Sequence, residues 1–257
     1  MSTTTKAGTH ALSLSGVSRN FGGIRAVADI SFDVSHGKRL TIIGTNGAGK
    51  STLFNLITGV YPLSSGSISV FGQDVSKQPA YSRAKLGIAR TFQTSKLFQG
   101  LTVRENLYTS LRQALGEKKI SWLANPSQSE QLHAESTSIL ERVDLLKKSD
   151  VLVSDISHGE SRQLEVAMAL AMRPKVLMLD EPAAGISPTE RGRLVDLLKS
   201  LDKEMTLVLI EHDMAVALAV ADEVIVMHDG TMFMQGSPDE VRNSSAVRDL
   251  YLGSNHE

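Results

Sequence analysis

The stretch Gly44-Thr45-Asn46-Gly47-Ala48-Gly49-Lys50-Ser51-Thr52 decides the fold of this 257-residue chain. It fits the pattern G-x-x-x-x-G-K-[ST], in which small residues let successive backbone N–H groups turn toward a polyphosphate. Lys50 is placed to reach the β and γ phosphates, and Ser51 to ligate Mg²⁺. The apolar run Leu40–Ile43 predicts a strand before the motif, and the amphipathic residues 53–57 predict a helix after it. We therefore expect a nucleoside triphosphate and Mg²⁺ to bind here.

Composition limits what the rest of the chain can do. The 27 basic and 28 acidic residues give a formal net charge of −1, so we expect no nucleic acid partner. The absence of cysteine excludes disulfides and thiolate metal sites and fits a reducing cytoplasm. Met1–His10 lacks the apolar segment of a signal peptide, and the apolar run Met214–Ala221 is far shorter than the roughly 20 residues of a membrane span. Any role at a membrane is expected to depend on a partner.

Short apolar runs alternate with helical patterns, which predicts an α/β fold. Two runs, Leu12–Leu14 and Ile30–Val34, predict strands of a small antiparallel sheet. Central strands are predicted at Leu40–Ile43, Val176–Leu179, Thr206–Ile210 and Val224–Met227. Helix starts with S/T-x-x-E capping boxes are predicted at Thr102–Glu105, Ser157–Glu160, Ser187–Glu190 and Ser237–Glu240.

The stretch between Gln93 and Ile156 differs from the rest, because it is helical and polar around a loop-like centre at 116–128. It predicts a helical subdomain at about residues 94–160. We expect this subdomain to be inserted in a single domain over residues 11–257, after a flexible N-terminus at residues 1–10.

A second chemical element is Val176-Leu177-Met178-Leu179-Asp180-Glu181, an apolar strand that ends in two carboxylates. Asp180 is predicted to hold Mg²⁺ and Glu181 to act as the general base on the attacking water. The alternative is a solvated strand end before the turn at Pro182. No N-K-x-D motif for guanine follows the phosphate loop, so we favour ATP over GTP.

A third element is Ile156-Ser157-His158-Gly159-Glu160, which resembles the signature loop of ATP-binding-cassette (ABC) ATPases. Phe21 corresponds to the aromatic that stacks on adenine, Gln93 to the Q-loop glutamine, and His212 to the switch histidine. The resemblance runs from about Leu12 to the C-terminus. It implies a P-loop NTPase fold with a RecA-like core, an antiparallel β front sheet and an inserted helical subdomain.

The resemblance also implies an ATPase site shared by two cassettes, in which the signature of one chain faces the γ-phosphate held by the other. The implied catalytic residues are Lys50, Gln93, Glu181 and His212, and the implied Mg²⁺ ligands are Ser51, Gln93 and Asp180. The implied nucleotide contacts are Phe21, Gly44, Asn46, Gly47, Ala48, Gly49, Lys50, Ser51, Thr52, Ser157 and Gly159.

The finer resemblance is to ATP-binding subunits of branched-chain amino acid importers. It rests on Phe21-Gly22-Gly23, Arg90-Thr91-Phe92-Gln93, Leu101–Leu107, Glu181–Gly185, Ile210–Met214 and Tyr251-Leu252-Gly253. That family implies two permeases in the membrane, a second ATPase subunit, and an extracytoplasmic solute-binding protein. It places the chain at the cytoplasmic face of the inner or plasma membrane, with branched-chain amino acids, amides or urea as the cargo. The alternative is the ATPase of a lipid or lipopolysaccharide exporter, and the second cassette can be identical or a sister chain.

Three positions depart from the general cassette pattern. His158 and Glu160 stand where the common signature has Gly and Gln, and Ser187 stands where Asp is usual. His158 must adopt dihedrals that a non-glycine tolerates. Glu160 places near the opposite site a carboxylate that the helix dipole favours but a nearby phosphate disfavours. Ser187 is suited to cap a helix that begins at Pro188.

Two sets of apolar residues have two possible interpretations. Phe21 is either the adenine-stacking residue or a core aromatic, and the glycine pair after it favours a loop. Leu97, Phe98 and Leu101 follow Gln93 and are expected to form a partly exposed groove for a permease helix, unless they are buried core.

Overall fold

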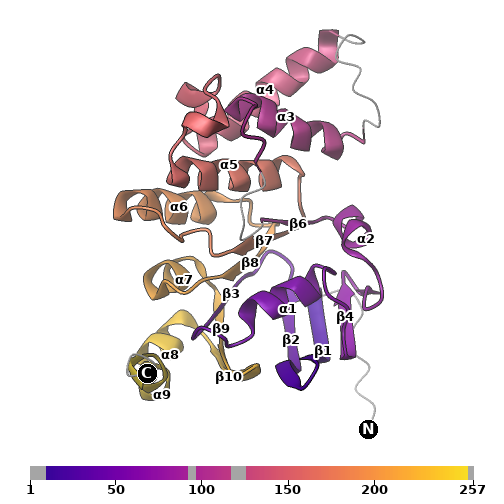
Figure 1. Ribbon diagram of the computed structural model, residues 1–257, viewed down its shortest axis with the longest axis vertical. Coiled ribbons are helices and arrows are strands. Elements are labelled where there is room, and N and C mark those ends of the chain that lie inside the picture. Colours follow the sequence, from indigo (N-terminus) through magenta and orange to yellow (C-terminus); the bar gives the residue numbers. More distant parts are fainter. Residues whose placement is uncertain (1–9, 92–96, 117–125, 254–257) are drawn as a thin grey trace. The chain divides into compact units, whose positions relative to one another are not determined.

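The computed structural model describes residues 10–91, 97–116 and 126–253. The predicted flexible segment up to residue 9 lies outside this range, and the first strand begins at His10. The chain divides into two compact units, residues 1–88 with 202–257 and residues 89–201, called unit 1 and unit 2 below (Figure 1).

Unit 1 contains a sheet of antiparallel strands in the order β2-β1-β4-β5, and this confirms the predicted front sheet. Its strands are β1 (His10–Phe21), β2 (Ile24–Ser35), β4 (Ser65–Val70) and β5 (Gln73–Asp74). Leu12 and Leu14 are buried at alternate positions of β1, and Val17 is buried beyond an irregularity in the strand. Gly22 and Gly23 form the turn that joins β1 to β2.

Unit 1 also contains neighbouring strands in the order β10-β9-β3-β8. They are β3 (Arg39–Gly44), β8 (Thr206–Ile210), β9 (Glu223–His228) and β10 (Thr231–Gly236). β3 pairs in parallel with both β8 and β9, while β10 pairs antiparallel with β9. β3 and β8 read as continuous apolar runs because parallel strands are covered on both faces. The central strands predicted at Leu40–Ile43, Thr206–Ile210 and Val224–Met227 are confirmed.

The helices of unit 1 are α1 (Lys50–Ile57), α2 (Ala80–Lys85), α7 (Met214–Val220), α8 (Pro238–Asn243) and α9 (Ser245–Gly253). α1 packs on β2, β3 and β8. Its C-terminal end is closed by Arg83, which is 1% exposed. The Nη1 of Arg83 donates to the carbonyl oxygens of Leu56 and Ile57, at 2.7 Å each, and its Nε donates to that of Gln78 at 2.9 Å. A buried cation therefore satisfies the last carbonyls of the helix.

Unit 2 is largely helical. It contains α3 (Val103–Ala114), α4 (Pro126–Arg142), α5 (His158–Ala171) and α6 (Pro188–Ser200), the short helices η1 (Leu146–Lys148) and η2 (Val153–Asp155), and the strands β6 (Ile88–Arg90) and β7 (Val176–Asp180). α3, α4 and α5 pack on one another, and β6 is the neighbour of β7 (Figure 1). The strand predicted at Val176–Leu179 is confirmed.

All four predicted capping boxes are present, at the starts of α3, α5, α6 and α8. In each box the Ser or Thr side chain accepts from the N3 backbone and the N3 glutamate accepts from the N-cap backbone. Pro188 and Pro238 take the predicted first helical positions. In the part of the chain that the structure describes, no helix combines the length and apolarity needed to cross a bilayer.

Candidate functional site: a phosphate loop and an acidic strand

The phosphate loop lies between the end of β3 and the start of α1, as predicted. Gly49 is the N-cap residue of α1, with φ of 92°. A Cβ at this position would overlap the backbone carbonyl oxygen of Ala26, so both the dihedral and the space require glycine. The loop is therefore held against the backbone of β2.

Lys50 is buried at the start of α1, with 6% of its surface exposed. Its Nζ donates to the carbonyl oxygens of Gly44 at 2.7 Å and Thr45 at 2.9 Å. Unlike the helices with capping boxes, α1 has no side-chain hydrogen bond at its N-cap and no acidic residue in its first turn. A helix start with a cation, free of carboxylates, fits the charge of a polyphosphate.

Phe21 ends β1 and is 40% exposed, so the alternative of a core aromatic is wrong. It is also the last residue of a strand, where the glycine pair had favoured a loop. Its ring meets that of Tyr61 edge-on at 5.5 Å, and the guanidinium of Arg19 lies 4.6 Å from its centroid. An exposed ring with a cation on it is suited to stack on a base.

His212 also belongs to unit 1, two residues past the end of β8. β8 pairs with the strand that leads into the phosphate loop, with Ile210 opposite Ile42. The N–H of Glu211 donates to the carbonyl of Ile42 at 3.2 Å. His212 itself is exposed, and its backbone N–H donates to the carboxylate of Glu211 at 3.2 Å. The strand pairing therefore brings this histidine to the same sheet edge as the loop.

The acidic strand lies in unit 2. Asp180, at the end of β7, is 3% exposed, and Glu181 follows it half-buried with φ of 50°. Positive φ is uncommon outside glycine and often occurs at functional sites. A solvated strand end is therefore not what the structure shows for Asp180.

Thr91 fixes this strand end, a role that sequence reasoning missed. The N–H of Thr91 donates to the carbonyl of Met178 at 3.0 Å, and the N–H of Asp180 donates to the hydroxyl of Thr91 at 3.2 Å. Arg90 lies close enough for its charge to interact with that of Asp180; burial lowers the pKa of Arg90, and the carboxylate opposes this shift. The signal in the sequence was the motif Arg90–Gln93, of which Arg90 and Thr91 lie next to the acidic strand.

The signature stretch forms the start of α5. Ser157 is the N-cap, and its side chain accepts from the N–H of Glu160 at 3.2 Å. A Cβ on the buried Gly159 would overlap the carboxylate of Glu190, which belongs to α6. His158 is the first residue of α5, a helical position open to any side chain, and a Cβ on Gly185, in the loop after β7, would crowd its ring. Ser187 caps α6, as predicted.

The remaining predicted residues have mixed outcomes. Gln93 lies outside the described residues. In the apolar set, Leu97 is 8% exposed and Phe98 is 55% exposed, while Leu101 is intermediate. The interpretation as core is right for Leu97 and wrong for Phe98.

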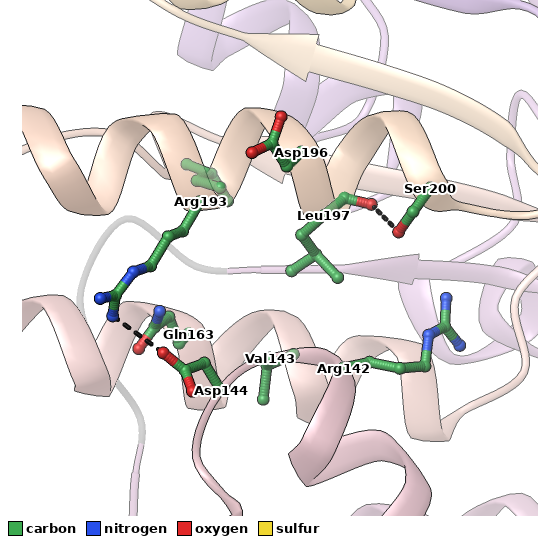
Figure 2. Close-up of a pocket in the computed structure, with 9 residues that line it drawn as sticks. Arg142, Val143, Asp144, Gln163, Arg193, Asp196, Leu197 and Ser200 are labelled. Atoms are coloured by element: carbon green, nitrogen blue, oxygen red, sulfur yellow. Dashed lines mark hydrogen bonds and ion pairs between the residues drawn. The ribbon is translucent and has the colours of Figure 1, made fainter.

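A surface pocket of about 400 Å³ lies within unit 2, against α4, α5 and α6. Figure 2 shows Leu197 pointing from α6 toward the side lined by Val143, with the ion pair of Arg193 and Asp144 at one end and Arg142 at the other. None of the nine residues that line it is a predicted site residue. This pocket therefore shares no lining residue with the phosphate loop or the acidic strand.

Comparison with known proteins identifies the family. Residues 27–184, more than half of the chain, match the family model described as ABC transporter. The chain is similar to LivG of Escherichia coli strain K12, a high-affinity branched-chain amino acid transport ATP-binding protein, with 38% identity over 94% of this chain and 97% of LivG. BraF of Pseudomonas aeruginosa strain PAO1, with the same description, is 34% identical over 94% of this chain and 97% of BraF.

Comparison with solved structures identifies the same family. The ADP conformation of MJ1267, an ATP-binding cassette of an ABC transporter, has a TM-score of 0.82 at 28% identity and covers 95% of this chain and 99% of MJ1267. The resemblance inferred from the motifs is thus confirmed. With its phosphate loop preformed and its acidic strand fixed, the chain belongs to the ABC transporter family, as an ATP-hydrolysing cassette that binds nucleotide.

Proposed function

We propose that this chain is the ATPase subunit of an importer for branched-chain amino acids or related small polar solutes such as amides and urea. The observation that carries the proposal is the match to LivG and BraF along nearly the full length of all three chains. Both relatives are named for branched-chain amino acid transport, which favours import over the lipid or lipopolysaccharide export alternative.

In the proposed site, ATP binds the phosphate loop. Lys50 holds the β and γ phosphates, the first-turn N–H groups of α1 add hydrogen bonds, and Phe21 stacks on adenine. The hydroxyl of Ser51, the amide of Gln93 and the carboxylate of Asp180 are oxygen donors of the kind Mg²⁺ prefers. When bound, Mg²⁺ neutralises charge on the phosphates.

For hydrolysis, Glu181 accepts a proton from the attacking water, and His212 donates a hydrogen bond to a γ-phosphate oxygen. Ser157 and Gly159 contact the γ-phosphate bound by a second cassette, identical or a sister chain. We propose that the inserted helical subdomain spans about residues 94–160, the range that contains α3 and α4, within a single domain over 11–257.

ATP hydrolysis by this chain can drive transport only if the chain binds a membrane partner. We place the chain at the cytoplasmic face of the membrane, bound to two permeases that receive solute from an extracytoplasmic binding protein. Phe98 supports this arrangement because it is a large apolar side chain, 55% exposed beside the buried Leu97. Its ring is suited to contact the apolar face of a permease helix.

The function is tested with Phe98→Asp. The variant should bind ATP normally as a purified subunit but fail to co-purify with permeases and fail to support uptake of labelled leucine. Phe98→Leu, which keeps an apolar surface, is the matched control, and uptake of labelled urea distinguishes the two cargo classes. Normal recruitment and uptake by Phe98→Asp would show that the docking surface lies elsewhere.

A further inference from the structure

Glu160 is the least expected residue of the signature stretch. It takes the N3 position of α5, where a carboxylate is favoured by the helix dipole. Its Oε2 accepts from the N–H of Ser157 at 2.8 Å, so the negative charge lies directly at the residue proposed to meet a γ-phosphate. A carboxylate at this place repels the phosphate that the helix start is to receive.

The structure shows a cation on this carboxylate. The Nζ of Lys148, the last residue of η1, lies 2.6 Å from Oε1 of Glu160. Burial raises the pKa of Glu160, but hydrogen bonds from Lys148 and from Ser157 outweigh this effect and hold the pKa below its ordinary value. Glu160 is therefore ionised at neutral pH, and its charge is balanced within unit 2.

A second carboxylate lies at the same place. Glu190 packs against Gly159, and its carboxylate accepts from the N–H of Ser187, the N-cap of α6. Its hydrogen bonds to Ser187 hold its pKa below the ordinary value, Glu160 opposes this, and the charge of Arg193 adds to it. With two carboxylates beside the start of α5, removal of either cation would leave excess negative charge there.

We infer that Lys148 is a positioning residue of the ATPase: it neutralises Glu160, so that the start of α5 accepts the γ-phosphate of ATP held by the opposite cassette. This inference rests on the proposed function, because it requires the signature of one cassette to face the nucleotide of another. Neutralisation by Lys148 also explains how this chain can have glutamate at position 160. The common signature has glutamine there, which is uncharged and needs no cation.

A purely structural role makes different predictions. The side chains of Lys148 and Glu160 are 43% and 20% exposed, and partly exposed ion pairs of this kind add little to stability. If the pair were purely structural, its loss would lower the free energy of unfolding but would cause no salt-dependent change in the KM for ATP. An electrostatic role changes the KM for ATP, and the change shrinks as salt screens the charges.

The test uses the assembled transporter and measures ATP hydrolysis. Lys148→Met should raise the KM for ATP roughly three- to tenfold at low salt, with kcat much less affected. The same substitution in a Glu160→Gln background should have no effect on KM, because no carboxylate remains to be neutralised. Lys147→Met, which removes the same charge from the adjacent exposed position of η1, is the matched control.

The outcomes separate the inference from the proposed function. If Lys148→Met raises KM equally in both backgrounds, or Lys147→Met has the same effect, the role of Lys148 is overturned. If Lys148→Met has no effect although Ser157→Arg slows hydrolysis, the inference fails and the opposed arrangement stands. If Ser157→Arg also leaves hydrolysis unchanged, the opposed arrangement itself is wrong, and the inference falls with it.

Discussion

The helices α1 and α5 begin in opposite ways, although both starts are assigned to phosphate. α1 begins after a glycine, without a side-chain cap, and its first residue is the buried Lys50. α5 begins with a complete capping box, in which Ser157 and Glu160 satisfy backbone groups of their own helix. The start of α1 therefore leaves its donors to a ligand, whereas the start of α5 has side-chain partners of its own and a carboxylate that Lys148 balances. Under the proposed function, this difference predicts that α1 provides most of the affinity for ATP and that the start of α5 contributes only when two cassettes meet.

The first experiment removes the proposed general base, Glu181, which belongs to neither helix start. Glu181→Gln should bind ATP as the wild type does but hydrolyse it about 10²–10⁴-fold more slowly, because an amide cannot accept the proton of water. Single-turnover hydrolysis in the assembled complex measures this rate. An unchanged rate would exclude Glu181 as the general base.

The second experiment tests the start of α1 by removing the positive charge of Lys50. Lys50→Ala should weaken ATP binding by roughly 100-fold, because a charge-assisted contact to phosphate is lost. Isothermal titration of the purified subunit gives the affinity, and the thermal unfolding midpoint shows whether the fold is kept. Equal ATP affinity for variant and wild type would contradict the assignment of the loop.

The third experiment tests the α5 side. Ser157→Arg should slow hydrolysis about tenfold or more, but only at the site of the opposite cassette. When Ser157→Arg and Lys50→Ala are on different chains of a pair, one site is left intact. When both are on the same chain, both sites are disabled. If the two arrangements give the reverse pattern, the signature acts on its own chain.

The smallest expected effect is on the pH dependence of the free energy of unfolding. The pKa of Glu160 is lower in the folded protein than its ordinary value, chiefly because of Lys148 and Ser157 and despite burial, so its ionised form stabilises the fold. This contribution is complete above pH values near 4.5 and is lost as pH falls through the lower folded pKa. The urea midpoint of the wild type should exceed that of Glu160→Gln at pH 7, and the difference should shrink below pH 4. Ser51→Ala, at the start of α1, changes no titrating group, so a shrinking difference there would contradict this explanation.

The sequence predicted the features that depend on neighbours along the chain. The strand, loop and helix around Lys50 and the four capping boxes were predictable because each is determined by residues a few positions apart. The contacts of Lys148 with Glu160 and of Thr91 with Asp180 were not, because they join residues that only the tertiary fold brings together. Leu97 and Phe98 show the same limit, since two adjacent apolar residues of similar pattern differ in exposure.

The buried Arg83 has a consequence for the stability of helix α1. A helix of eight residues such as α1 is too short to be stable by itself in water. Its C-terminal carbonyls are nevertheless held by the guanidinium at 2.7 Å, at the end of the helix opposite the phosphate loop. Lysine could not replace this arginine, because a single ammonium cannot match the planar set of donors. Arg83 therefore supports α1 through contacts at the end opposite the phosphate loop, which a bound nucleotide would not replace.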